Sequence, residues 1–561
     1  MPCRVGLNKS LRILSRITEG AGTVHHLGLL DELSRYIREC SLCGLGQTAP
    51  NPVLTTLRHF HHEFEDHIVA RRCQAGVCEE LALSPCENSC PLHMNIPRFL
   101  QLYKENRLDE AFLSVIMENP LPASTGRVCQ HPCDSRCRRQ TLDEPVNMRE
   151  VHRFIADSVF FSDRYEEILK RVLSHKLEPT GRKIAISGAG PAGLTAAFYL
   201  AMLGHEVTVY DSKSEAGGML RFALPEYRLP KAALRREIEL IERLGVKFIF
   251  NTRVGFDVPL NELADRFDSV FISIGTWRES WVYQPGTELK GVYPALLFLE
   301  AVAKGERVPI GKNVAIIGGG NAAIDSARTA LRRGAEVTVF YRREHKDMPA
   351  IEEETQAAKD EGAQFVFLAA PHRVIGDKAG NVKAIEIVKT TLGGYDASGR
   401  RKPVPTDEIR RYECDSVIFA IGESVDLDFA RASGLSLMPS GTIDVDRFSL
   451  ESSRAGFYAG GDVITGASNV SNAMAYGKQA ARNIDMKLME TDRWAEILPN
   501  LEFGQDTPEV PSPNHRNNGQ MLAPVVRVRS NAEVVMGLSH EETLDETCRC
   551  LRCDVKVANV S

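Results

Sequence analysis

Residues 183–211 read KIAISGAGPAGLTAAFYLAMLGHEVTVYD, and this stretch decides the fold of the chain. A β-branched run, a glycine-rich turn, a helix of small residues and a second β-branched run form the pattern of a βαβ unit. The glycines allow a tight turn and let a pyrophosphate approach the helix N-terminus. Asp211 ends the second run, where an acid would bind a ribose hydroxyl. The stretch predicts a dinucleotide site with six candidate residues: Gly188, Gly190, Pro191, Ala192, Gly193 and Asp211.

The same pattern returns at residues 313–343, which read NVAIIGGGNAAIDSARTALRRGAEVTVFYRR. At the place that corresponds to Asp211 this copy has Tyr341, and two arginines follow it. A carboxylate there would repel a 2′-phosphate, whereas guanidinium groups bind one. The second site is therefore predicted to take NADPH, unless the arginines are only a solvated surface pair. Its candidate residues are Gly318, Gly320, Asn321, Ala323, Arg342 and Arg343.

The 14 cysteines gather at the two ends of the 561-residue chain, with ten in the first 137 residues and three in the last 14. Thiols spaced by two to four residues in a reducing compartment are typical of metal ligands, with disulfides or inert buried thiols as the alternatives. The chain therefore combines two dinucleotide sites with metal sites at its ends.

The bulk composition excludes other classes of protein. A net charge of −6 gives no support for nucleic-acid binding, and no window of 18 apolar residues predicts a membrane span. The first residues lack the apolar core of a signal peptide, so we expect a cytoplasmic protein. A chain of 561 residues is too long for one core and predicts several domains.

Three further elements resemble the two-dinucleotide flavoproteins related to the glutamate synthase small subunit. They are the GGML run at 217–220, the PEYRLPK run at 225–231 and the GGD run at 460–462. The resemblance implies that FAD occupies the first fold and NADPH the second. It adds six candidate cofactor contacts, which are Gly218, Leu220, Arg228, Gly461, Asp462 and Val470.

Residues 86–154 resemble the helical domain that carries two [4Fe–4S] clusters in glutamate synthase small subunits and dihydropyrimidine dehydrogenase. By position, Cys90, Cys129 and Cys133 would bind the second cluster. His152 stands where the family has a fourth ligand, Glu or Gln, and the alternative is a helix-surface histidine. An imidazole ligand raises a cluster's reduction potential relative to thiolate.

The first cluster is left with Cys86 and Cys137, because the family's preceding Cys-x2-Cys element does not occur before this domain. A similar element, Cys550-x2-Cys553, stands near the end of the sequence, and we expect it to supply the missing pair. The alternatives are a tail that binds nothing, one that contacts a partner's cluster, or one donated by a second copy in a homodimer.

The first seventy residues resemble the C-terminal cluster domain of the NADH-binding flavoprotein subunit of respiratory complex I and of related hydrogenase and formate dehydrogenase subunits. Of that family's ligands the sequence keeps Cys3 and Cys43, with Cys40 nearby. They indicate a third iron–sulfur cluster, although four thiolates are not evident. His67, Cys73 and Cys78 are spaced closely enough to bind zinc.

The predicted fold class is α/β, with two tandem Rossmann-like domains preceded by α-helical iron–sulfur domains. The expected divisions are residues 1–72 and 73–165 for the iron–sulfur domains, 180–312 and 424–490 for the FAD domain, 313–423 for the NADPH domain, and 491–561 for a linker and tail.

The expected activity is electron transfer between NADPH and [4Fe–4S] clusters through FAD, by hydride transfer that needs no catalytic side chain. The expected partners are other redox subunits of a hydrogenase-, formate dehydrogenase- or transhydrogenase-like complex, or ferredoxin. The alternatives are a glutamate synthase small subunit and, in another class, a non-catalytic redox-sensing or scaffold subunit.

Overall fold

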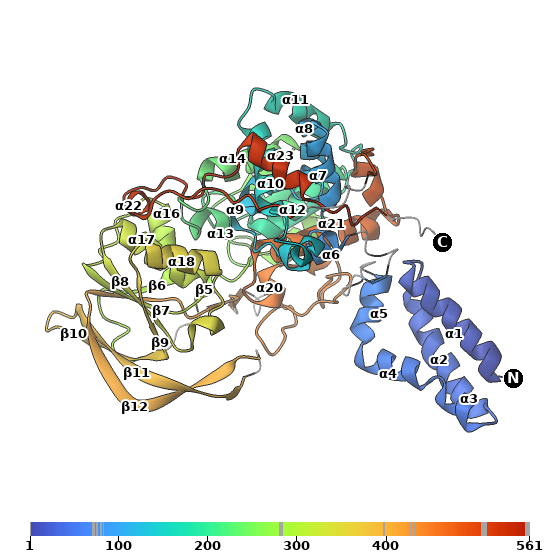
Figure 1. The fold of residues 1–561 in the computed structure, drawn as a ribbon, viewed down its shortest axis with the longest axis horizontal. Coiled ribbons are helices and arrows are strands. Elements are labelled where there is room, and N and C mark those ends of the chain that lie inside the picture. The colour runs from blue at the N-terminus through green and yellow to red at the C-terminus, as the bar shows by residue number, and fades with distance from the viewer. Residues whose placement is uncertain are drawn as a thin grey trace.

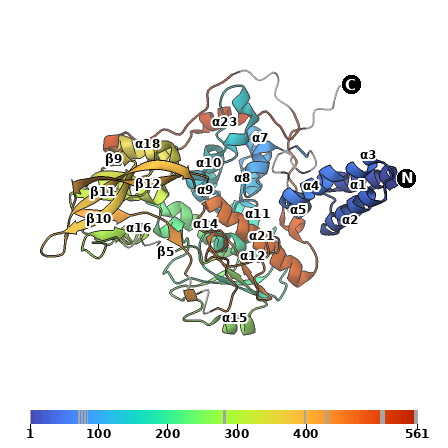
Figure 2. The ribbon, with the colours of Figure 1, turned by 90° about the horizontal axis from the view of Figure 1, so that it is seen from below.

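The computed structural model describes residues 2–69, 73, 77–78, 81, 84–279, 284–396, 399–426, 428–429, 433–506 and 513–555. The expected boundary after residue 72 falls on a position outside these described residues. Helices α1 to α5 form an arm at one end of the molecule, and the β10–β12 sheet lies at the other end (Figures 1 and 2). No helix of the described chain is long and apolar enough to cross a membrane.

The first βαβ stretch belongs to a five-stranded parallel sheet with the order β15-β4-β1-β2-β3. Strand β4 is buried along its whole length, as expected for a parallel sheet covered on both faces. Its strands are β1 Lys183–Ser187, β2 Glu206–Tyr210, β3 Lys247–Ile249, β4 Ser269–Ile272 and β15 Phe457–Ala459. Its helices are α12 Pro191–Met202, α13 Met219–Phe222, α14 Lys231–Arg243, α15 Leu260–Arg266, α20 Asp462–Thr465 and α21 Val470–Met489.

The repeat forms a second five-stranded parallel sheet with the order β6-β13-β7-β8-β9. Its strands are β6 Val292–Pro294, β7 Asn313–Ile317, β8 Glu336–Tyr341, β9 Gln364–Phe367 and β13 Ser416–Phe419, and its helices are α16 Ala295–Ala303, α17 Asn321–Arg332 and α18 Glu352–Asp360. Two parallel sheets with helices confirm the predicted α/β class.

Two smaller antiparallel sheets accompany the parallel ones. A three-stranded sheet follows β9, with strands β10 Ala369–Gly376, β11 Val382–Tyr395 and β12 Arg401–Glu413. A short ladder pairs β5 Arg278–Glu279 with β14 Glu423–Ser424. Since β5 precedes the second parallel sheet in sequence and β14 follows it, this ladder joins the two chain crossings between the Rossmann-like folds.

A helical layer precedes the sheets and packs on the first of them. It consists of α6 Pro85–Ser89, α7 Ile96–Lys104, α8 Leu108–Ile116, α9 Pro122–Val128, α10 Met148–Phe160 and α11 Tyr165–Leu173. The side chains of Ser84, Asn95 and Asn147 accept hydrogen bonds from the first turns of α6, α7 and α10 and so fix where these helices begin. The layer and the first sheet share one apolar core.

The N-terminal arm has a separate apolar core that includes Ile13, Leu30 and Leu57. Its helices are α1 Pro2–Thr18, α2 Val24–Cys40, α3 Gly44–Thr48, α4 Asn51–His59 and α5 His61–Ile68. The arm meets the first fold where Asp66 accepts a hydrogen bond of 2.8 Å from Arg447.

The C-terminal segment returns to the helical layer. After α22 Pro524–Arg527, helix α23 His540–Cys548 packs on α7 and α10 (Figure 1). Ser539 and Glu542 form a capping box at its start. The Tyr103 hydroxyl of α7 lies 2.6 Å from His540 Nδ1. The end of the described chain is thereby held beside residues that precede it by about four hundred positions.

Helices α12 and α21 cross with almost no space between their backbones. A Cβ atom at Gly477 would lie 2.2 Å from the carbonyl oxygen of Ala192, in the first turn of α12. Neither backbone has room to give way, because α12 is buried along nearly all of its length between the sheet and α21. A glycine at this position is required by the crossing.

We predict that Gly477→Ala lowers the free energy of unfolding by about 1–3 kcal/mol, because the added methyl group separates two packed helices. Denaturant titration followed by circular dichroism measures the change. Gly28→Ala is the matched control, because Gly28 lies in α2 with no described atom within 4 Å of its Cβ position. This control should be neutral or stabilising by up to about 1 kcal/mol. Equal stability of the two variants would contradict the tight crossing.

Candidate functional site

The turn after β1 leaves bare backbone at the N-terminus of α12. Gly188 has a φ of +106°, and α12 begins at Pro191, directly after Gly190. Among the described atoms, a Cβ at Gly190 would meet only the Gly218 Cα, at 4.0 Å. Gly193 serves packing instead, since its Cβ would lie 1.9 Å from the Gly188 oxygen. Exposed N–H groups at a helix N-terminus without side chains over them fit a dinucleotide pyrophosphate.

Other predicted contacts converge on the same turn. The Asp211 carboxylate accepts hydrogen bonds of 2.7 Å from the backbone N–H groups of Ala189 and Lys213, and burial raises its pKa. A Cβ at Gly461 would lie 3.0 Å from that of Ala192. Asp462 starts α20 and accepts a hydrogen bond of 2.7 Å from Ser468.

The remaining predicted contacts are two apolar residues and one arginine. Leu220 is buried and Val470 is the first residue of α21. Arg228 instead donates hydrogen bonds of 2.9 and 2.7 Å to Asp325 of α17 and lies 3.2 Å from Glu354 of α18. Its side chain joins the two Rossmann-like folds in this structure, and its contact with a cofactor stays a prediction.

The second glycine turn has the same geometry. Gly318 has a φ of +147°, and a Cβ at Gly320, the residue before α17, would have its nearest described neighbour 4.0 Å away in Pro349. Asn321 accepts a hydrogen bond of 3.0 Å from the Ile351 N–H, and Ala323 is buried. This turn also fits a dinucleotide.

The two arginines after β8 have different surroundings. Arg343 is buried and donates hydrogen bonds of 2.6 Å to Asp396 and 2.7 Å to the Arg401 carbonyl oxygen. The Arg342 side chain is exposed. Partial desolvation lowers its pKa, and repulsion by the positive charges of Arg343 and Arg400 lowers it further. Three clustered guanidinium groups suit a phosphate, with Arg342 as the accessible one.

A first metal-type cavity, which we call the histidine cavity, is lined by Cys90, Cys129, Cys133 and His152. These residues come from the ends of α6 and α9, the loop after α9 and helix α10. His152 Nδ1 lies 3.1 Å from the Met148 carbonyl oxygen, which can only accept, so Nδ1 carries the proton. Burial lowers the pKa of His152 to about 4, so the ring is neutral.

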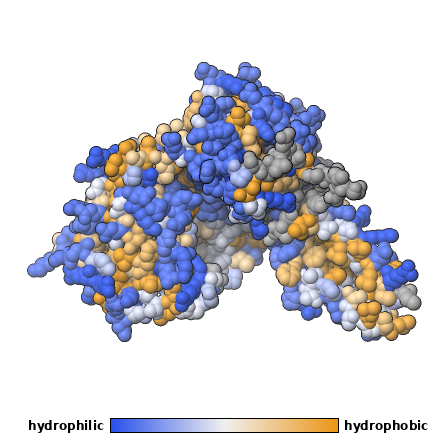
Figure 3. Space-filling view, in the orientation of Figure 1, coloured by the Kyte–Doolittle hydropathy of each residue, from blue (hydrophilic) through white to orange (hydrophobic). Residues whose placement is uncertain are grey.

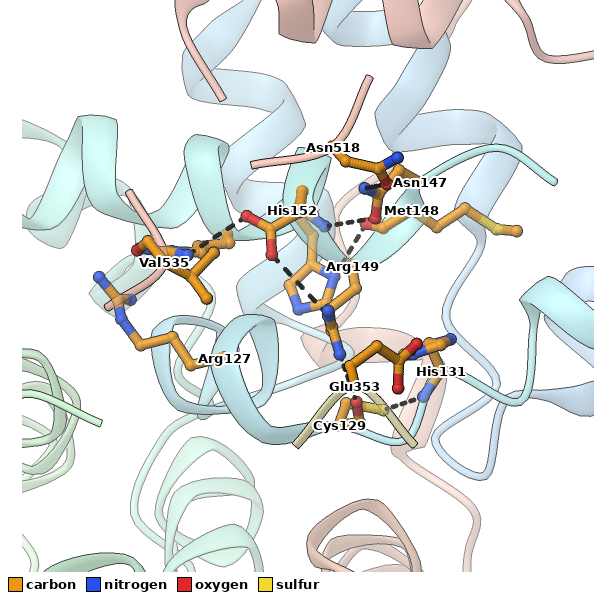
Figure 4. Close-up of polar contacts among 12 residues, drawn as sticks. Arg127, Cys129, His131, Asn147, Met148, Arg149, His152, Glu353, Asn518 and Val535 are labelled. Atoms are coloured by element: carbon orange, nitrogen blue, oxygen red, sulfur yellow. Dashed lines mark hydrogen bonds and ion pairs between the residues drawn. The ribbon is translucent and has the colours of Figure 1, made fainter. Parts of the chain in front are cut away.

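The orientation of His152 leaves its Nε2 lone pair available to a metal. Figure 4 shows the imidazole directed from α10 towards the segment that carries Cys129 and His131. The Thr125 hydroxyl lies 3.4 Å from Nε2. A ring held through Nδ1–H to a carbonyl with Nε2 facing the cavity is the usual arrangement of a ligating histidine.

A second cavity, which we call the tail cavity, is lined by Cys86, Cys137, Cys550 and Cys553. The first two come from the helical layer and the last two from the segment after α23. Ile96 and Met148 line both cavities, so the two are neighbours. The structure therefore brings the C-terminal pair to the two cysteines that the sequence left without partners.

The thiols in both cavities are partly or wholly shielded from solvent, and Cys133 is buried. Burial raises the pKa of Cys86 well above its usual value, and the neighbouring Cys550, Cys137 and Cys553 raise it further. Burial likewise raises the pKa of Cys90 to about 11 and that of Cys550 to about 12. Iron would offset the cost of burying several thiolates together, because it binds them and neutralises their charge. The sulfurs that bind a [4Fe–4S] cluster lie around a cavity and do not touch one another. The residues of both cavities fit this arrangement.

Sequence reasoning missed three residues at these cavities. Ser471, in the first turn of α21, lines the histidine cavity, and its hydroxyl lies 3.1 Å from Cys129 Sγ. Lys478 of α21 donates a hydrogen bond of 2.7 Å to the Leu92 carbonyl oxygen, near Cys90. Arg549 holds the tail and is only 1% exposed. No local signal marks Ser471 or Lys478, because their partners lie more than three hundred residues away.

The N-terminal cysteines divide into two groups. Cys40 and Cys43 are exposed, and a Cβ at Gly46 would lie 3.2 Å from that of Cys3. The third cluster that these residues predict stays a prediction. Nearer the helical layer, the Cys78 Sγ lies 3.3 Å from His67 Nε2. Burial acts to raise the pKa of Cys73, but hydrogen bonds from Cys78 and Val77, with a contribution from His67, outweigh it and lower that pKa to about 7.

Three family descriptions match the chain. Residues 182–477 match the pyridine nucleotide-disulphide oxidoreductases, residues 1–67 the iron–sulfur binding region of the NADH-ubiquinone oxidoreductase F subunit, and residues 56–163 the 4Fe-4S cluster domain II of dihydropyrimidine dehydrogenase. These matches confirm that iron–sulfur domains precede the dinucleotide folds.

Curated relatives span most of the chain. The NADP(+)-dependent formate dehydrogenase subunit beta of Moorella thermoacetica is 34% identical over 99% of this chain and 87% of its own length. The NADPH-Fe(3+) oxidoreductase subunit beta of Geobacter sulfurreducens is 34% identical over 98% and 87%. The glutamate synthase [NADPH] small chain of Escherichia coli is 34% identical over 74% and 90%. They confirm the predicted resemblance to the glutamate synthase small subunit.

Proposed function

The chain belongs to the pyridine nucleotide-disulphide oxidoreductase family as an NAD(P)H-dependent FAD iron–sulfur oxidoreductase, and we propose that it carries electrons between NADPH and a partner redox subunit through two [4Fe–4S] clusters. One observation carries this proposal. Helix α21 touches both the first dinucleotide turn, through Gly477 and Ala192, and the histidine cavity, through Ser471. A flavin bound in the first fold would therefore lie near the histidine cavity, where a cluster could accept its electrons.

The residues of the two turns would hold the dinucleotides. The backbone N–H groups at the start of α12, with Asp211 and Asp462, would bind FAD, and those at the start of α17, with Arg342, would bind NADPH. When bound, FAD exchanges electron pairs with NADPH and single electrons with the clusters. The protein's own part is to place the two dinucleotides and to exclude water from the cavities.

The cavities would hold the clusters in a fixed order. Cys90, Cys129, Cys133 and His152 would bind the cluster nearer the first fold, because Ser471 of α21 lines that cavity. Cys86, Cys137, Cys550 and Cys553 would bind the next one. The Ser471 hydroxyl and the Lys478 ammonium group place a hydrogen bond and a positive charge beside the first set of sulfurs, and both stabilise a more negative cluster.

A partner subunit is the proposed destination of the electrons. The Moorella and Geobacter relatives are both named as β subunits and match nearly all of this chain, whereas the glutamate synthase small chain matches 74% of it. The arm carries exposed apolar residues, among them Leu42 at 98% and Leu45 at 82%, and Figure 3 shows apolar patches on its visible face. Exposed apolar surface of this kind is typical of a subunit interface. We favour a formate dehydrogenase- or iron reductase-like complex over glutamate synthase.

The decisive test concerns the tail cavity. Replacing Cys550 and Cys553 together by serine should remove about four irons per chain, since serine cannot replace thiolate at a [4Fe–4S] site. Iron and flavin assays of the purified protein measure the loss, and flavin content should not change. Cys548→Ser is the matched control, because Cys548 lies in the same segment but is exposed. Full iron content in the double variant would refute the ligand assignment.

The histidine cavity yields a prediction about potential. His152→Cys should keep its iron and lower the midpoint potential of one cluster, because imidazole raises the potential relative to thiolate. A redox titration followed by electron paramagnetic resonance measures the shift. His131→Gln is the control, because His131 lines the same cavity but pairs with Asp134 at 3.2 Å. An unchanged midpoint in His152→Cys, or an equal shift in both variants, would show that His152 is not a ligand.

The nucleotide preference is predicted to depend on Arg342. Arg342→Ala should raise the KM for NADPH about ten- to a hundredfold and leave that for NADH unchanged, since one charge-assisted hydrogen bond contributes about 1.5–3 kcal/mol. Steady-state assays with an artificial electron acceptor measure both constants. Arg373→Ala is the control, because Arg373 is an exposed arginine of β10 paired with Glu386. Equal losses with NADPH and NADH would contradict the assignment.

A further inference from the structure

His67, Cys73 and Cys78 form a compact group outside both cluster cavities. Their three ligand atoms all lie within 4.8 Å of one another, and Cys73 is only 2% exposed. No other group of three or more potential ligands in the described chain is as close. Ligand atoms this close surround one ion, whereas the cysteines of the two cavities enclose the larger space of a cluster.

The orientation of His67 suits a metal ligand. Its Nδ1 lies 2.7 Å from the Glu63 carbonyl oxygen, one turn earlier in α5, and the carbonyl can only accept a hydrogen bond. Nδ1 is therefore the protonated nitrogen, and the Nε2 lone pair faces the sulfurs, 3.3 Å from Cys78 Sγ. A histidine that binds a metal through one ring nitrogen usually donates a hydrogen bond from the other, often to a backbone carbonyl oxygen.

The group lies where the arm joins the rest of the molecule. The Leu81 N–H donates a hydrogen bond of 2.9 Å to the Cys78 carbonyl oxygen. The Leu81 side chain lies against Gly20, in the turn between α1 and α2, where a Cβ atom would be 2.9 Å from it. On the other side, Asp66 precedes His67 and binds Arg447 of the first fold. A bond between α5 and the segment of Cys73 and Cys78 would thus fix the junction.

We propose that His67, Cys73 and Cys78 bind one zinc ion that fastens the connection between α5 and α6 to the arm. Two thiolates and one imidazole form a donor set that zinc prefers, and its tetrahedral geometry leaves the fourth position to water. This site is independent of the proposed electron path, because none of its ligands lines either cavity.

The experiment uses the full chain with its iron and flavin. Metal analysis should find about one zinc per chain, and zinc K-edge absorption should show two sulfur neighbours near 2.3 Å and one nitrogen near 2.0–2.1 Å. The zinc edge is unaffected by the iron clusters. His67→Ala and the double variant Cys73→Ser/Cys78→Ser should lose the zinc, retain iron and flavin, and release the arm faster in limited proteolysis.

The control variant is His61→Ala, because His61 lies in the same helix with a side chain that is 53% exposed. It should keep its zinc. Wild-type protein without zinc after preparation in zinc-containing buffer would overturn the proposal, whether or not the variants fold. So would a disulfide between Cys73 and Cys78 in the native protein, which would make them a redox pair, or zinc retained in the double variant.

Discussion

The buried guanidinium group of Arg549 fixes the return of the C-terminal segment, and the tail cavity depends on it. It donates hydrogen bonds of 2.6 Å to Glu546, 3.0 Å to Asp143 and 2.7 Å to the Glu144 carbonyl oxygen. Glu546 in turn accepts hydrogen bonds from the backbone of Asn147 and Asn517. Removing a buried charge from its partners is costly, so these contacts favour one position of the segment. That position puts Cys550, the next residue, into the wall of the cavity.

Helix α21 imposes a second constraint, because it belongs to the first fold and to the histidine cavity at once. Its close crossing with α12 at Gly477 leaves no freedom to slide, so Ser471 and Lys478 are held at the sulfurs with the same precision as the glycine turn. Burial lowers the pKa of Lys478, while nearby Glu118 and Cys90 favour its charged form. Because α21 lines the histidine cavity and packs on the start of α12, it holds the sulfur site and the dinucleotide turn at a fixed separation.

The sequence predicts features whose residues lie close together in the chain. It does not predict contacts between residues that are far apart in the chain. The glycine turns at Gly188 and Gly318 were predictable because a turn, a helix and two strands lie within thirty residues. Arg342 and Arg343 look equivalent in sequence, yet Arg343 is bound by Asp396, which lies 53 residues away. Cys129 and Ser471 are 342 positions apart, and no sequence pattern links them. Cys550 and Cys553 are predicted as ligands only because a family resemblance left Cys86 and Cys137 two thiolates short.

The two Rossmann-like folds are joined by a buried network of charged side chains. Arg228 of the first fold pairs with Asp325 and Glu354 of the second, and Glu354 also pairs with Arg328. Arg328 is fully buried and binds Glu361 at 2.6 Å. Apolar surfaces tolerate sliding, whereas a buried network loses its hydrogen bonds with small displacements and so selects one relative position. Since NADPH and FAD would occupy different folds, this network sets how closely the two can approach.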